Sequence, residues 1–90
     1  MQTLKQFIED NNRWIAIFGK QGMTFPLTES DVADLARTID SQLSPENLHC
    51  DGEISHAQAA RKYQFLTTVA EELKWYARAN NLRAPEFYEY

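Results

Sequence analysis

The sequence predicts an all-α protein, a three-helix arrangement with one long C-terminal helix. The first observation is that apolar residues recur at steps of four and three between Ile54 and Asn80, which places them on one face of a helix. The second is that a helix-start signal precedes each of three amphipathic stretches. The third is the length, because 90 residues, 43% of them hydrophobic, suit a single helical domain over residues 1–90.

The first helix is expected to cover residues 1–18. Thr3 and Gln6 have the spacing of a capping box, in which two side chains satisfy two free backbone amides, and Gly19 is well placed to end the helix. The residues expected on its inner face are Leu4, Phe7, Ile8, Asn11, Ile15 and Phe18. Asn11 is the only polar member of this face.

Residues 13–27 also allow a small N-terminal β-hairpin. In this alternative, Asn11 and Asn12 end a shorter helix, residues 14–18 form one strand, and residues 23–27 return as its partner. The β-branched and aromatic residues favour a strand locally, whereas a two-stranded hairpin is marginal unless it packs on helices. The sequence leaves both interpretations open.

The second helix is expected over Thr28–Leu43. Thr28 is a suitable cap with Asp31 at the third helical position, and Leu27 and Val32 can form a hydrophobic staple across the cap. The expected apolar stripe consists of Val32, Leu35, Ala36, Ile39 and Leu43. The polar residues expected on the opposite side are Glu29, Asp31, Asp34, Arg37, Asp40 and Gln42.

The third helix is expected over Ile54–Asn80, after a single helical turn at residues 44–48 and a tight turn at residues 51–52. Ser55 and Gln58 have the spacing of a capping box, and Asn80 and Asn81 tolerate the left-handed conformation that ends helices. The apolar stripe consists of Ala59, Tyr63, Leu66, Ala70, Leu73 and Ala77, flanked by Phe65, Val69 and Tyr76. Because the same seam could serve a second copy of the chain, a homodimer through the long helix is a further expectation.

Five aromatic residues form the candidate interaction surface: Trp14, Trp75, Tyr76, Phe87 and Tyr88. Aromatic side chains carry much of the binding energy at protein interfaces. The other interpretation of these residues is that they complete the core. The function expected from them is that of a small non-enzymatic protein-interaction protein with an unidentified protein partner.

The metal-capable side chains gather within eight residues: His49, Cys50, Asp51, Glu53 and His56. A zinc ion could use Cys50 and one or both histidines, and Cys50 beside a histidine could form a thiolate nucleophile. The rest of the chain offers no further Cys or His, and no sequence pattern indicates an oxyanion hole. We therefore expect no metal, no cofactor and no enzymatic activity, with a metal or thiol site at residues 49–56 as an alternative.

Charge and composition bear on the remaining classes of function. The net charge of −4 disfavours nucleic-acid binding, which needs a clustered positive face, although Lys74 and Arg78 share a helix face and would carry that alternative function. The sequence contains no run of about eighteen apolar residues, so we expect no membrane-spanning segment. A single cysteine and the absence of a secretory signal pattern lead us to expect a cytoplasmic protein.

One segment resembles a known group of proteins. The run Leu-Ser-Pro-Glu-Asn-Leu-His-Cys-Asp-Gly-Glu at residues 43–53, with Ser55 and the Arg-Lys-Tyr run at residues 61–63, is similar to short uncharacterised proteins of bacteriophages and prophages. The resemblance covers about residues 43–74 and carries no known activity and no functional residue. It implies a phage or prophage setting, in which the chain would modulate a host protein.

Overall fold

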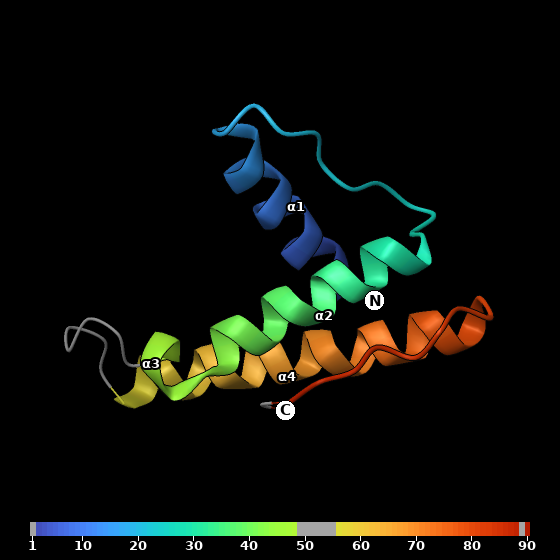
Figure 1. The fold of residues 1–90 in the computed structure, drawn as a ribbon. Helices are drawn as coiled ribbons and strands as arrows, with labels where there is room; N and C mark the ends of the chain where they lie inside the picture. Colours follow the sequence, from blue (N-terminus) through green and yellow to red (C-terminus); the bar gives the residue numbers. More distant parts are fainter. Residues whose placement is uncertain (1, 49–55, 89) are drawn as a thin grey trace.

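The computed structural model describes residues 2–48, 56–88 and 90, whose arrangement is shown in Figure 1. In chain order the helices are α1 (Gln2–Ala16), α2 (Glu29–Leu43), the single turn α3 (Pro45–Leu48) and the long α4 (His56–Ala79). Both α1 and α2 pack against α4, and α1 rises away from the α2–α4 pair toward its C-terminal end (Figure 1). The all-α class and the long C-terminal helix are therefore confirmed.

The β-hairpin considered for residues 13–27 is not supported, because the described residues contain no strand. Instead the chain leaves α1 through a turn at Gly19, where φ is +73°. The Gly19 amide donates to the carbonyl of Ala16 at 3.0 Å, and the Lys20 amide donates to that of Ile15 at 3.3 Å. This pair of bonds is a Schellman motif, and glycine adopts its left-handed backbone without a steric cost.

The connector between α1 and α2 is held by side-chain hydrogen bonds and not by strand pairing. Asn12 Oδ1 accepts from the Met23 amide at 2.8 Å, and Asn12 Nδ2 donates to the Met23 carbonyl at 2.7 Å. These two bonds take the place of the ladder that a hairpin would need. Further along, Leu27 is buried in the core, while Phe25 is partly exposed and places its ring 5.5 Å from that of Tyr76.

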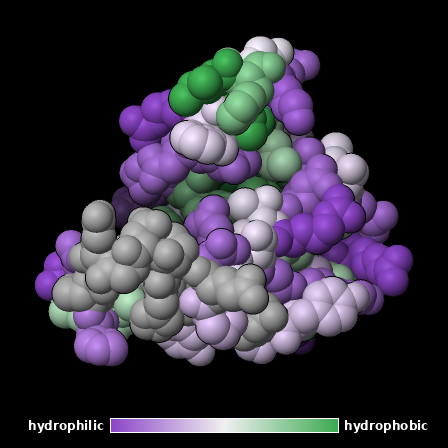
Figure 2. All heavy atoms as spheres, turned by 60° about the vertical axis from the view of Figure 1, so that its left-hand side comes forward, coloured by the Kyte–Doolittle hydropathy of each residue, from purple (hydrophilic) through white to green (hydrophobic). Residues whose placement is uncertain are grey.

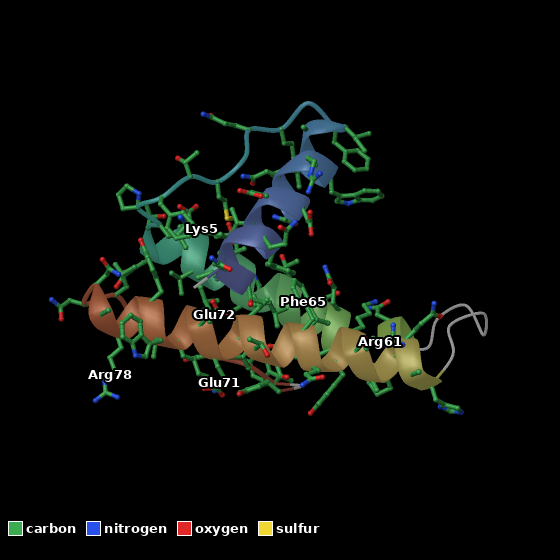
Figure 3. All side chains as sticks on the ribbon, turned by 180° about the vertical axis from the view of Figure 1, so that it is seen from behind. Lys5, Arg61, Phe65, Glu71, Glu72 and Arg78 are labelled. Atoms are coloured by element: carbon green, nitrogen blue, oxygen red, sulfur yellow. The ribbon has the colours of Figure 1, made fainter. Side chains whose placement is uncertain are left out.

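The N-terminal end of α1 is stabilised from a distant part of the chain. α1 begins at Gln2, so Thr3 lies inside the helix and does not cap it. The Leu4 amide, in the first turn, donates to Oε1 of Glu72 on α4 at 3.4 Å. Figure 3 shows Glu72 directed toward α1. A carboxylate suits this position because the N-terminus of a helix carries a partial positive charge.

The prediction for α2 is confirmed in its cap and in its apolar stripe. Thr28 Oγ1 accepts from the Asp31 amide, and an Asp31 carboxylate oxygen accepts from the Thr28 amide, both at 3.1 Å. All five residues of the expected stripe are buried: Val32, Leu35, Ala36, Ile39 and Leu43. Asp40 is the exception on the polar side, because it is only 9% exposed and the C-terminal segment covers it.

The apolar seam of α4 forms the centre of the core. Its buried residues are Ala59, Leu66, Val69, Ala70, Leu73, Tyr76 and Ala77, and except for Ala59 they join one cluster with the buried residues of α1 and α2. Tyr63, which the spacing assigned to this seam, is half exposed. The seam expected to hold a second copy is thus covered by α1 and α2 of the same chain. Ile54 and Ser55, at the expected start of the helix, lie outside the described residues.

The C-terminal segment after α4 folds back along the α2–α4 pair (Figure 1). Asn81, with φ of +56°, ends α4, and the Leu82 amide donates to the Ala77 carbonyl at 2.8 Å. This confirms the expectation that Asn80 or Asn81 takes the left-handed conformation. The returning backbone is fixed to α2, where the Arg83 amide donates to Oε1 of Glu29 at 3.0 Å.

Candidate protein-interaction surface

The five aromatic residues predicted as an interaction surface do not come together in the structure. Trp14 lies near the raised end of α1, and Trp75 lies on the outer side of α4, opposite the buried seam. Tyr76 belongs to the core, and Phe87 and Tyr88 belong to the C-terminal segment. Trp14, Trp75 and Tyr88 are exposed, but they lie on different parts of the fold and do not form one surface.

Tyr76 is a core residue with a polar end. It is 7% exposed, and its hydroxyl accepts a hydrogen bond from the Leu27 amide at 2.9 Å. The ring fills space in the α4 seam while the hydroxyl satisfies a backbone donor of the connector. Tyr76 is accordingly removed from the candidate surface.

Phe87 and Tyr88 are used within the chain in different ways. The ring of Phe87 packs on the edge of the core and lies 5.5 Å from the ring of Tyr90. Lys74 Nζ lies over both rings, 5.6 Å from the centroid of Phe87 and 4.0 Å from that of Tyr90. The Tyr88 amide is bonded to Asp40, whereas its side chain is the most exposed of the large aromatic ones.

Lys74 is therefore occupied by the aromatic rings of the C-terminal segment. It also lies 3.7 Å from a carboxylate oxygen of Glu71. Figure 3 shows Arg78 pointing away from the body of the fold. Of the two cations that would carry nucleic-acid binding, Lys74 is thus engaged within the chain.

The raised end of α1 carries an apolar surface. Trp14, Ile17 and Phe18 are 63%, 72% and 64% exposed, and the Trp14 and Phe18 rings meet edge to face with centroids 5.8 Å apart. Figure 2 shows hydrophobic side chains, in green, at the top of the molecule, above a mostly hydrophilic surface. Clustered exposed side chains of this size are uncommon on a surface without a binding role.

This apolar surface continues down α1 onto α4. Phe7 lies in the core with its ring centroid 6.5 Å from that of Phe65, which is partly exposed on α4 (Figure 3). Between them and Trp14 lies a hollow of about 270 Å³, lined by Phe7, Asp10, Asn11, Trp14, Gln42 and Phe65. We call Phe65, Phe7, Trp14 and Phe18 the aromatic row.

Two members of the aromatic row were not predicted to be surface residues. Phe18 was assigned to the inner face of the first helix, and Phe65 to the flank of the long helix. The helical period gives the face on which a residue lies, but it does not tell how far along the helix the core extends. In the structure the core covers only the first half of α1, through Leu4, Phe7 and Ile8.

The aromatic row has little net charge around it. Among the described residues that line the hollow, Asp10 alone is charged, and its carboxylate pairs with the Arg13 guanidinium one turn along α1. The same Asp10 oxygen accepts from the side-chain amide of Gln6 at 3.0 Å. The surface is therefore apolar with a neutralised rim, whereas the whole chain carries a net charge of −4.

A larger groove of about 410 Å³ lies between α2 and the C-terminal segment. Two arginines line it, but each is paired with a carboxylate of its own segment, Arg37 with Asp34 and Arg83 with Glu86. The remaining walls are mostly small or apolar side chains: Val32, Ala33, Ala36, Ala84 and Pro85. The described residues that line this groove do not include a histidine or a cysteine that could serve as a catalytic base or nucleophile.

The predicted metal or thiol site lies largely outside the described residues. Of its five candidate ligands only His56 is described, and it is exposed in the first turn of α4. Among residues 2–48, 56–88 and 90, no group of three His, Cys, Asp or Glu side chains is close enough to hold a metal ion.

No protein-family model, no curated protein and no solved structure matches this chain. Within the described part of the chain, no helix combines the length and the apolar character needed to cross a lipid bilayer.

Proposed function

We propose that this chain is a small non-enzymatic protein-interaction protein and that it binds through the aromatic row. The observation that carries the proposal is the exposure of Trp14, Ile17 and Phe18, three large apolar side chains gathered at the C-terminal end of α1 and in the turn that follows it. Aromatic residues flanked by a polar rim are typical of the centre of a protein interface. No catalytic constellation in the described residues competes with this use.

The internal packing of the fold gives no other reason for this surface. The core uses Leu4, Phe7 and Ile8 of α1, so the helix could end soon after Asn12 and still fill the same space. The residues beyond that point extend α1 into solvent with apolar side chains. Burying these side chains against a partner would remove apolar surface from water, which makes binding more favourable.

The resemblance of residues 43–53 to phage proteins supports a class of partner. In a phage or prophage setting a small interaction protein would bind and modulate a protein of the bacterial host. This part of the proposal depends on the resemblance and not on the geometry of the aromatic row.

Two tryptophans of nearly equal exposure provide a matched test. Trp14 is 63% exposed within the aromatic row, and Trp75 is 64% exposed on the outer side of α4. The tagged chain is incubated with a bacterial lysate that also contains an untagged copy, and captured proteins are quantified by mass spectrometry. We expect Trp14→Ser to abolish capture and Trp75→Ser to preserve it.

The same experiment can contradict the proposal. Capture that is lost equally in both variants, or that is unchanged in Trp14→Ser, would show that the aromatic row is not the binding surface. Circular dichroism of each variant checks that the helices remain folded, which we expect because both side chains lie largely in solvent.

A further inference from the structure

We infer that the chain attaches to the surface of a lipid bilayer that contains anionic phospholipid, through the turn that follows α1. The side chains that enter the lipid are Ile17 and Phe18, which we call the tip, and the cations that meet the headgroups are Arg13 and Lys20. The inference goes beyond the proposed function, whose protein contact includes the hollow on the side of α1. It also differs from a membrane span, because only the end of one helix enters the lipid.

The tip projects from the fold. Figure 1 shows α1 rising away from the α2–α4 pair, with the turn that follows it at the far end. Ile17 is 72% exposed and Phe18 is 64% exposed, and neither of them lines the hollow beside Trp14. A bilayer is a broad surface, so it buries apolar side chains where they project beyond the polar body of a protein. The tip has this shape, whereas the hollow suits a side chain of a protein partner.

Apolar and basic side chains are ordered along the axis of α1. Arg13 lies one turn behind Ile17, which is roughly 6 Å at 1.5 Å per residue. The Lys20 amide donates to the Ile15 carbonyl at 3.3 Å, so the backbone brings Lys20 back to a similar level. Apolar side chains of surface-bound helices enter a bilayer by about 5–10 Å. When the tip is inserted to that depth, both cations lie among the headgroups, and their long stems remain in contact with the apolar region.

The local charge has the opposite sign to that of the whole chain. Residues 11–28 contain two cations, Arg13 and Lys20, and no aspartate or glutamate, so all thirteen acidic residues lie elsewhere in the sequence. Asp10, the nearest of them in sequence, is paired with Arg13. The rest of a chain of net charge −4 repels an anionic surface only weakly from a distance, because the Debye length is about 8 Å at physiological ionic strength. Charge complementarity at the tip therefore favours anionic phospholipid.

Trp14 lies at the level where a bilayer favours an indole ring. It is 63% exposed, one turn before the tip, and its ring meets that of Phe18 edge to face. Indole rings prefer the boundary between lipid and water, where the ring is buried and the N–H remains hydrated. Trp14 can therefore report the contact. Trp75, 64% exposed on the outer side of α4, is its matched control.

The test uses vesicles of phosphatidylcholine, with and without phosphatidylserine, and measures the protein that sediments with them. We expect the unmodified chain to bind the vesicles that contain phosphatidylserine and to bind the others more weakly. Ile17→Ser should lower the partition coefficient roughly tenfold or more, because an apolar side chain no longer leaves water. Lys20→Glu should weaken binding only where phosphatidylserine is present, and Trp75→Ser should change neither value.

Tryptophan fluorescence locates the contact on the fold. In Trp75→Ser, the emission of Trp14 should shift to shorter wavelength when phosphatidylserine vesicles are added. In Trp14→Phe, which keeps an apolar ring beside the tip, the emission of Trp75 should not change. Circular dichroism checks that Ile17→Ser and Lys20→Glu remain folded, which we expect because both positions are exposed.

Three results would each overturn the inference. They are a lack of binding to both kinds of vesicle, equal binding to both kinds, and undiminished binding by folded Ile17→Ser. A shift in the emission of Trp75 in place of Trp14 would overturn it as well, because the contact would then lie on α4.

The capture experiment, performed on a lysate cleared of membranes by ultracentrifugation, tests the proposed function separately. Capture of a protein through Trp14 without vesicle binding would contradict the bilayer contact alone. Vesicle binding without Trp14-dependent capture would contradict the protein partner alone.

Discussion

The backbone amide of Tyr88 donates a hydrogen bond to Oδ2 of Asp40 at 2.8 Å, across 48 positions of sequence. Asp40 is the only charged residue among the buried residues of the described chain. A carboxylate in this position accepts a strong bond from a backbone donor, and it fixes the C-terminal segment to α2. The contact explains why Asp40 is buried under the C-terminal segment, although the helical pattern predicts that it faces solvent.

Replacing Asp40 should loosen the C-terminal segment. We expect Asp40→Ala to lower the free energy of unfolding by about 1–3 kcal/mol, because the Tyr88 amide loses its acceptor. Asp40→Asn keeps an acceptor oxygen of similar shape and should cost less. Urea unfolding of the three proteins measures the difference, and amide exchange at Tyr88 locates it. Equal stability of Asp40→Ala and the unmodified chain would show that this bond does not hold the segment.

Removing the charge of Lys74 should weaken the same segment without leaving a cavity. Lys74→Met keeps a long apolar stem but loses the cation over the rings of Phe87 and Tyr90, and we expect a loss of about 0.5–1 kcal/mol. Lys74→Arg should retain most of the interaction. Thermal unfolding monitored by tyrosine absorbance is the measurement. A loss in Lys74→Arg as large as that in Lys74→Met would argue against a cation–ring contact.

The hydroxyl of Tyr76 should stabilise the connector between α1 and α2 more than it stabilises α4. Tyr76→Phe leaves the ring in the core but removes the acceptor for the Leu27 amide, so we expect a destabilisation of about 1–3 kcal/mol. Faster amide exchange should be confined to Leu27 and its neighbours. Uniformly faster exchange along α4 would mean that the ring itself had moved, contrary to this prediction.

Gly22 and Asn12 should behave as a coupled pair. A Cβ on Gly22 would lie 2.6 Å from Cγ of Asn12, whose amide is held by its two bonds to Met23. Gly22→Ala should therefore destabilise the fold by about 1–3 kcal/mol through this clash. In the Asn12→Ala background the same substitution should cost less, because the two closest atoms, Cγ and Oδ1, are gone and only Cβ of residue 12 remains, at 3.0 Å. A double-mutant cycle with no coupling energy would contradict this account.

Local signals in the sequence predicted the local structure well. The capping box at Thr28 and Asp31, the stop at Gly19 and the stop at Asn81 each depend on residues only a few positions apart, and all three are present. The stripe of α2 follows in the same way from a helical period. Such features could be predicted because the interactions that cause them form within one or two turns of the backbone.

Contacts between distant segments could not be predicted from these signals. The Leu4 amide finds its acceptor on Glu72, 68 positions away, and Asp40 is buried only because the C-terminal segment returns to it. The aromatic row was not predicted as a surface for a related reason. Period alone assigned Phe18 to the inner face of α1, but the partner helix does not extend far enough to cover it.

The attachment of α1 to α4 also sets an order of events during synthesis. α1 is translated first, yet the helix that buries Phe7 and Ile8 is completed about sixty residues later. At 5–20 residues per second, the ribosome needs roughly 3–12 seconds to supply it. The apolar face of α1 is therefore without its partner during that interval, and α1 can dock only after α4 has been made.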